Sequence, residues 1–276
     1  MRHAALTLTA LLAAGALSAC STSSAADDPG APLGVLAAST PHAEILEWVD
    51  ERDDAYELDI SIVTGGPEAN AAVANGSVPV NFFQHEPYLL DWQDQTGLGG
   101  VEVLAPVHIE PISLYSEKHA ALSELPDGAR IVLPRSPSNF ARGLLLLQDH
   151  GLLTLDGELD PGAVSQITLA SITDNPRNFE FLPVEDELAA RSLDDPTVSA
   201  AVINSNFALE AGYDPVADGL IAESPAGNPY ANIVVAASDS VDDPRVTALV
   251  EALTSAETAD WIRERFGSAV VPVAGE

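Results

Sequence analysis

The sequence has little positive charge and almost no sulfur. Its 276 residues include 11 Lys and Arg against 42 Asp and Glu, so the formal net charge at pH 7 is −31. A surface of this charge repels phosphate backbones, and binding nucleic acid requires cationic groups that displace counterions. We therefore expect no nucleic-acid partner. The hydrophobic content of 46% excludes a disordered chain, and the length allows one large domain or two modest ones.

The N-terminal residues have the pattern of a secretion signal. Residues 4–17 form an apolar run that would make about 21 Å of helix, shorter than the roughly 30 Å core of a bilayer. A short apolar run followed by small residues is typical of a cleaved signal and not of a membrane span. The sequence Leu-Ser-Ala-Cys at 17–20 resembles the bacterial lipobox, in which the cysteine thiol is acylated and the cysteine becomes the new N-terminus.

We therefore expect residues 1–19 to be a signal peptide and Cys20 to carry a lipid such as palmitate, with a plain secretory signal cleaved near Ala19 as the alternative. Because Cys20 is the single cysteine, its acylation leaves no thiol for a disulfide, for catalysis or for a metal. Residues 20–32 are small, polar, Pro and Gly residues, which predict a flexible tether. The globular body would be lipid-anchored on the extracytoplasmic face of the cell membrane.

From Leu33 onward, short apolar runs alternate with helical patterns. The predicted strands are 33–38, 58–64, 101–107, 112–115, 130–133, 179–184, 198–203 and 230–237, with a further strand end at residues 82–83. The predicted helices are 41–52, 67–76, 87–95, 137–150, 185–191, 244–253 and 255–266. This alternation predicts an α/β fold with largely parallel sheets. The uneven strand spacing favours two lobes facing across a cleft, with the ligand where strand ends and helix N-termini converge.

Signatures of enzymes are missing from the sequence. It has no Gly-x-Ser-x-Gly elbow, no Walker loop and no Gly-x-Gly-x-x-Gly run, and its six histidines are scattered. His108 and Glu110 come closest to a metal-binding pair, and we interpret them as surface or hinge residues. We therefore expect a protein that is not an enzyme, with no cofactor and no metal site.

Residues 81–89 combine aromatic side chains with an imidazole at a predicted strand-to-helix junction. Phe83, His85 and Tyr88 would lie over the carboxyl end of a sheet, where they would form an apolar slot with a polar edge. Such a slot suits a soft side chain such as a thioether. The alternative is an ordinary core with a hydrogen-bonded histidine.

Three further residues are candidates for holding a zwitterion. Arg142 follows the start of a predicted helix, where a cation opposes the helix dipole unless an anion joins it. A guanidinium fork beside free N–H groups is a carboxylate receptor, although a surface arginine paired with an acid would look the same. Asn204 and Asn232 end or enter apolar strands, where an amide can accept from an ammonium and donate to a carboxylate, or can be a buried structural residue.

Several segments, in one order, resemble the substrate-binding lipoproteins of bacterial methionine ABC importers. They are PHAEIL near the start, QHEPYL, residues 110–118, NFARGLLLLQDHGLL, residues 174–178 and 191–195, AVIN and NPYANIVV. The resemblance spans about residues 33–270, with the lipobox in place. So many motifs in register make it specific.

The resemblance implies a two-lobed, type II periplasmic-binding-protein fold whose lobes close on a free amino acid. Residues 33–109 and 230–276 would form lobe I, and residues 110–229 would form lobe II. The protein would be a monomer that captures L-methionine, or a related amino acid, and delivers it to an ABC permease with a cytoplasmic ATPase. By the same resemblance, Phe83, His85 and Tyr88 would line the side-chain pocket, Arg142 would clamp the α-carboxylate, and Asn204 and Asn232 would hold the zwitterion.

The sequence departs from this family's pattern in two ways. Members usually carry a pocket tyrosine before the Phe-Gln-His motif, where residues 64–70 here are about two residues shorter and have no tyrosine. The chain is also unusually acidic, with one lysine, Lys118. The first departure leaves another apolar amino acid or a methionine-containing dipeptide as alternative ligands. From other classes, the alternatives are a secreted α/β hydrolase, which would need an activated nucleophile beside a base, and a surface adhesion protein.

Overall fold

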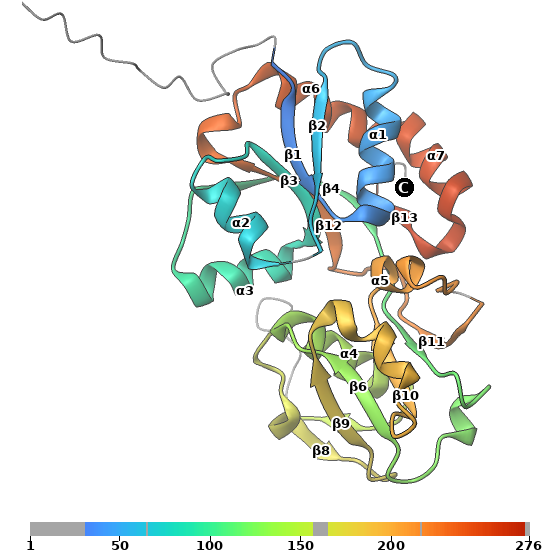
Figure 1. Ribbon diagram of the computed structural model, residues 1–276. Helices are drawn as coiled ribbons and strands as arrows, with labels where there is room; N and C mark the ends of the chain where they lie inside the picture. Colours follow the sequence, from blue (N-terminus) through green and yellow to red (C-terminus); the bar gives the residue numbers. More distant parts are fainter. Residues whose placement is uncertain (1–30, 65, 157–164, 216, 274–276) are drawn as a thin grey trace, which may run out of the picture.

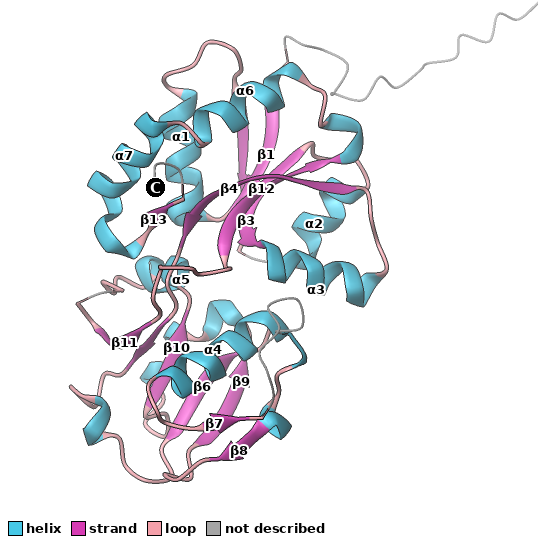
Figure 2. Cartoon of the chain, turned by 180° about the vertical axis from the view of Figure 1, so that it is seen from behind, coloured by secondary structure: helices cyan, strands magenta, loops and turns pink. Residues whose placement is uncertain are grey.

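The computed structural model describes residues 31–273 apart from 65, 157–164 and 216 (Figure 1). The predicted signal peptide, the predicted lipidation site Cys20 and the tether up to residue 30 lie outside the described residues. The described chain forms two bodies, each built on its own sheet and joined by two chain segments (Figures 1 and 2). No helix within the described residues is long and apolar enough to cross a membrane.

The first body is a six-stranded sheet with helices on both faces. Its strand order is β13-β4-β12-β3-β1-β2. The strands are β1 (Leu33–Ala37), β2 (Leu58–Ile62), β3 (Val80–His85), β4 (Val101–Ile109), β12 (Ala231–Ala237) and β13 (Val271–Pro272). The helices are the π-helix η2 (Ser39–Ala43), α1 (Glu44–Asp50), α2 (Pro67–Ala74), α3 (Glu86–Thr96), α6 (Pro244–Leu253) and α7 (Ala256–Phe266), with short 3₁₀ helices η8 (Ser238–Ser240) and η9 (Gly267–Ala269).

The central strand β12 explains why this body has two cores. Successive side chains of a strand point to opposite faces of the sheet. Ile233 and Val235 therefore pack against α2 and α3, while Val234 and Ala236 pack into the core formed with α1, α6 and α7. A strand covered on both faces is a continuous apolar run in the sequence, as this one is.

The second body is a five-stranded sheet of order β11-β5-β10-β6-β9. Its strands are β5 (Ser113–Tyr115), β6 (Arg130–Pro134), β9 (Glu180–Val184), β10 (Ala200–Ile203) and β11 (Gly219–Ala222), and β7 (Thr154–Leu155) and β8 (Ile172–Asp174) form a separate pair. Its helices are α4 (Pro137–Asp149) and α5 (Ser205–Glu210), with 3₁₀ helices η3 (Leu122–Glu124), η5 (Leu169–Ser171), η6 (Asp186–Leu188) and η7 (Ala190–Asp194). Along β6, Ile131 and Leu133 pack on the α4 side and Val132 packs on the opposite side.

The chain passes between the two bodies twice. It leaves the first sheet after β4 and enters the second at β5, and it returns between β11 and β12. We propose that these crossings divide the lobes, with residues 33–109 and 230–276 in lobe I and residues 110–229 in lobe II.

The sheets are mixed, so the prediction of largely parallel sheets is wrong. β1 pairs parallel with β2 and β3, and β6 pairs parallel with β9 and β10. The pairs of β12 with β3 and β4, of β13 with β4, and of β5 with β10 and β11 are antiparallel. Parallel neighbours need a crossover within one body. β4 leaves the first body and β12 returns to it, so these two strands run in opposite directions.

Candidate ligand-binding site

A cavity of about 810 Å³ lies between the two lobes. Its walls come from the β3–α3 junction and the start of α2 in lobe I, and from the starts of α4, η6 and α5 in lobe II. All six residues singled out in the sequence line it: Phe83, His85, Tyr88, Arg142, Asn204 and Asn232. The volume falls within the range of about 300–1,000 Å³ that is usual for small-molecule sites.

The junction of β3 and α3 forms an uncharged aromatic wall. His85 is the N-cap residue of α3, and its Nδ1 accepts the backbone N–H of Tyr88 at 3.1 Å. The Tyr88 ring stands edge-to-face to Phe83 and His85, with centroids 6.2 and 6.3 Å apart. Burial, helped by the positive charge of Arg142, lowers the pKa of His85 to about 3, so the ring is neutral at pH 7.

The wall formed by Val63, Thr64 and residues 66–68 has no aromatic side chain. Thr64, Gly66, Pro67 and Glu68 line the cavity here. The glycine has a φ of 92°, which lies in the left-handed region, and a Cβ there would lie 3.3 Å from Oε2 of Glu68. This side of the cavity therefore has the Glu68 carboxylate and no aromatic ring, as the missing tyrosine in the sequence predicts.

Arg142 is a buried member of an ion pair and not a surface residue. Its side chain is 1% exposed, and its Nη2 lies 2.5 Å from Oε2 of Glu223 and donates to the carbonyl oxygen of Glu110 at 2.7 Å. Nε donates to both carboxylate oxygens of Glu223, at 3.0 and 3.1 Å. The guanidinium carbon lies 4.3 Å from the ring centroid of Tyr230. Within the described part of the chain Nη1 makes no hydrogen bond, and the residue lines the cavity.

Asn139 is a cavity residue to which sequence reasoning gave no role. Its Nδ2 donates to Asp186 at 2.9 Å, and its Oδ1 accepts from Nε2 of His85 at 3.0 Å and from Nδ2 of Asn204 at 3.1 Å. The Oδ1 of Asn204 is buried and has no partner among the described residues. The sequence signal that could have indicated Asn139 is its position three residues before Arg142, at the start of a predicted helix.

The two lobes contact each other across the cavity. The hydrogen bond between His85 and Asn139 joins the end of β3 to the start of α4. A second bond runs from the backbone N–H of Ser138 to Oδ2 of Asp91 at 2.8 Å. The first N–H groups of a helix have no partner within the helix, and a carboxylate there is favoured by the helix dipole. The carboxylate of Asp91 in α3 thus accepts one of the free N–H groups in the first turn of α4.

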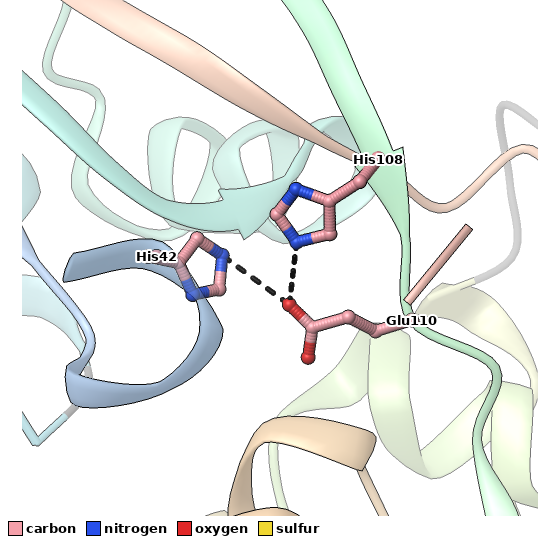
Figure 3. A group of neighbouring side chains, drawn as sticks. All are labelled: His42, His108 and Glu110. Atoms are coloured by element: carbon pink, nitrogen blue, oxygen red, sulfur yellow. Dashed lines mark hydrogen bonds and ion pairs between the residues drawn. The ribbon is translucent and has the colours of Figure 1, made fainter. Parts of the chain in front are cut away.

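Asn232 is oriented by a buried cluster of His42, His108 and Glu110, whose side chains converge in Figure 3. His42 Nε2 lies 3.1 Å from Oδ1 of Asn232 and 3.3 Å from Oε1 of Glu110, and His108 Nε2 lies 2.8 Å from the same carboxylate oxygen. The backbone N–H of Asn206 donates to Oε2 of Glu110 at 2.9 Å. The carboxylate of Glu110 therefore accepts hydrogen bonds from both lobes.

This cluster offers three ligand atoms within 4.8 Å of one another, but its surroundings favour hydrogen bonding over metal binding. Burial lowers the pKa of His42 to about 4 and of His108 to about 3, and raises the pKa of Glu110. A metal-bound histidine donates its other ring N–H to an acceptor. The Nδ1 atoms of both histidines lack any partner in the described residues. His108 and Glu110 are buried, so they are not surface residues; His108 lies in β4 and Glu110 directly follows it, where the chain leaves the first sheet.

A two-lobed α/β fold with a ligand-sized cavity between the lobes is the architecture of substrate-binding proteins. The chain belongs to the NlpA lipoprotein family, whose model matches residues 33–274. It is 35% identical over 266 residues to the methionine-binding lipoprotein MetQ of Bacillus subtilis, covering 95% of this chain and 96% of the relative.

Solved structures agree with this assignment. An ABC transporter periplasmic substrate-binding protein from Coxiella burnetii is 32% identical, with a TM-score of 0.80 over 87% of this chain and 100% of that one. A nutrient-binding protein from Burkholderia cenocepacia bound to methionine is also 32% identical, with a TM-score of 0.79 over 87% of this chain and 99% of that one.

Proposed function

We propose that this protein is the lipid-anchored, extracytoplasmic substrate-binding component of an ABC importer, and that it captures L-methionine for a membrane permease driven by a cytoplasmic ATPase. The observation that carries the proposal is the cavity between the lobes, which combines an uncharged aromatic wall with the guanidinium of Arg142 and the amides of Asn204 and Asn232. The methionine-bound neighbour and the methionine-binding relative support the same ligand class. The protein acts as a monomer and performs no covalent chemistry.

The α-carboxylate of the ligand would be held by Arg142 and Asn232. Nη1 of the arginine is the guanidinium nitrogen that the ion pair with Glu223 leaves available among the described contacts. Asn232 uses its Oδ1 to accept from His42, so its Nδ2 group is the one left to donate to the ligand. Two donors, one of them charged, form a receptor for a carboxylate.

The α-ammonium group would be held by Asn204, which lines the cavity and whose buried Oδ1 has no partner among the described residues. Carboxylates around the cavity add a negative field: Glu68, Asp91, Asp186, Glu187 and Glu210 all line it. A buried acceptor and surrounding negative charge both favour a cation at this end of the ligand.

The ligand side chain would lie against Phe83, His85 and Tyr88. The neutral imidazole uses both nitrogens in hydrogen bonds with protein groups, so it presents its ring and no free polar atom. Thioethers make favourable contacts with aromatic rings. A second carboxylate, as in glutamate, would be buried there without a partner.

Transport would also require an anchor at the membrane and a movement of the two lobes relative to each other. Acylated Cys20 would hold the protein at the membrane, and residues 21–32 would let the body reach the permease. Because the cavity has walls from both lobes, ligand contacts would stabilise the closed arrangement over an open one.

Calorimetric titration of protein stripped of ligand by unfolding and refolding tests the proposal. We expect L-methionine to bind more tightly than L-leucine and far more tightly than L-glutamate. Tighter binding of L-glutamate, or no binding of any apolar amino acid, would contradict the proposal. Preference for the dipeptide Gly-Met would favour the alternative ligand class and would point to the wall formed by Val63, Thr64 and residues 66–68 as its cause.

A further inference from the structure

We infer that Asp186 is a positioning residue for amine recognition: through Asn139 it fixes the orientation of the Asn204 amide, so that an oxygen and not an NH₂ group faces the ligand. The role rests on the proposed function, because it requires a ligand with a free amino group. Asp186 lines the cavity, and the role that we assign to it acts through Asn139 and Asn204.

Asp186 is anchored at the start of α4. It is the first residue of η6, its Oδ1 accepts the backbone N–H of Ser136 at 3.0 Å, and its Oδ2 accepts the Ser136 hydroxyl at 2.5 Å. The same Oδ2 lies 2.9 Å from Nδ2 of Asn139. An ionised carboxylate can only accept hydrogen bonds. The Asn139 amide must therefore turn its NH₂ group toward Asp186 and its Oδ1 away from it.

The contact on the opposite side of Asn139 favours the same orientation. The backbone N–H of Tyr88 can only donate, so Nδ1 of His85 is the unprotonated nitrogen and the ring proton is on Nε2. Nε2 therefore donates to Oδ1 of Asn139, 3.0 Å away. A flipped Asn139 would place NH₂ against the Nε2–H and Oδ1 against the Asp186 carboxylate, so both contacts would be repulsive.

The orientation passes on to Asn204. With Oδ1 of Asn139 fixed as an acceptor, its contact with Asn204 at 3.1 Å requires the NH₂ group of Asn204. The Oδ1 of Asn204 is then directed elsewhere, and it is buried with no donor in the described residues. An unpaired buried acceptor is costly, and an ammonium group supplies the missing donors. With the amide of Asn204 reversed, its NH₂ group would point toward that ammonium group, and two donors cannot form a hydrogen bond.

Asp186→Asn tests this chain of contacts at nearly constant size. The backbone N–H of Ser136 holds the new amide oxygen, so the new NH₂ group faces the NH₂ group of Asn139 and opposes its orientation. The matched control is Glu187→Gln, which removes one negative charge from the same 3₁₀ helix and also lines the cavity. Among the described contacts, Glu187 makes no hydrogen bond to Asn139. The ligands are L-methionine and 4-(methylthio)butanoate, which is methionine without its amino group, titrated directly or by competition.

We expect Asp186→Asn to weaken methionine binding about 10-fold or more, in line with a hydrogen bond to a charged group, and to change binding of the analogue less than about threefold. Glu187→Gln removes one charge of the negative field around the ammonium group without a contact to Asn139, so we expect it to weaken methionine binding by no more than about threefold. Melting without ligand verifies folding, and Asp186→Ala replaces Asp186→Asn if that variant does not fold.

Equal losses for Asp186→Asn and Glu187→Gln would mean that only charge matters and would overturn the inference. Equal weakening of methionine and the analogue by Asp186→Asn would indicate general distortion and would also overturn it. Unmodified protein that binds no methionine would refute the proposed function itself. Unmodified protein that binds methionine while Asp186→Asn binds it equally well would refute the positioning role alone.

Discussion

Arg142 belongs both to the proposed ligand site and to a buried ion pair, so its replacement affects binding and stability separately. The side chain is 1% exposed and holds Glu223 through Nε and Nη2, while Nη1 is the nitrogen that we assign to the ligand. Arg142→Ala removes the ligand donor and also leaves Glu223 without its cation. The control Glu223→Gln removes the ion pair but keeps the guanidinium in place.

The two effects have different magnitudes. Removing one partner of a buried ion pair costs about 3–5 kcal/mol, and the carboxylate of Glu223, which is 16% exposed, places Arg142→Ala at about the lower end of that range. Loss of a buried contact to the ligand carboxylate costs about 2–5 kcal/mol, a factor of about 30 to several thousand in affinity. Glu223→Gln should lower stability as well. It should not weaken methionine binding, because an unpaired cation attracts an anion more strongly.

Calorimetric titration with L-methionine measures the affinity, and urea unfolding of the ligand-free variants measures the stability. We expect Arg142→Ala to lose both and Glu223→Gln to lose stability alone. Arg142→Ala protein that binds methionine within a few-fold of the unmodified protein would show that the carboxylate is held elsewhere. Equal loss of binding in Glu223→Gln would show that Arg142 acts on the site only through the fold.

Two further predictions concern the anchor and the buried histidines. Cys20→Ala should release the protein from membranes without changing methionine affinity. If the Cys20→Ala variant stays in the membrane fraction after a carbonate wash, the predicted lipidation is contradicted. The free energy of unfolding should fall as the pH drops from about 6.5 toward about 3, because His42, His85 and His108 stay neutral in the fold and take up protons when unfolded, each adding up to about 1.4 kcal/mol per pH unit. The raised pKa of Glu110 adds stability as the pH falls and offsets part of this loss. Urea unfolding at several pH values gives the free energy of unfolding as a function of pH. The slope of this plot should differ between the unmodified protein and His108→Gln by the equivalent of about one proton. Equal slopes would refute a neutral buried His108.

Elements with strong local signals could be predicted from the sequence. α6 spans Pro244–Leu253 as predicted, with proline in its first turn and Asp243 capping it through the backbone N–H of Arg245. The junction of β3 and α3 was also predicted, because an aromatic strand end precedes a proline at the start of a helix. In these places the residues that determine the structure are neighbours in the chain.

The missed elements are short or depend on distant partners. α5 and β13 span only Ser205–Glu210 and Val271–Pro272, too few residues to show a hydrophobic period. The antiparallel entry of β12 depends on the path of the chain through the second lobe, which no local pattern encodes.

The candidate site shows the same division. The six lining residues could be chosen from local motifs and family resemblance, and the structure brings all of them to one cavity. Their partners could not be chosen. Glu223 lies 81 residues from Arg142, and Asp186 lies 47 residues from Asn139, in a chain with 42 acidic residues to choose from. Only the folded arrangement identifies which carboxylate meets which donor.

Native mass spectrometry of the mature protein, purified without unfolding, tests the central claim most directly. If the cavity between the lobes holds both charged ends of a zwitterion and places its side chain on the aromatic wall, as we propose, the ligand should stay bound through purification. We expect a bound species heavier than the bare chain by the mass of one methionine, which disappears in Arg142→Ala. A mass increment matching another compound, or bare protein that gains no mass after incubation with excess L-methionine, would contradict the account.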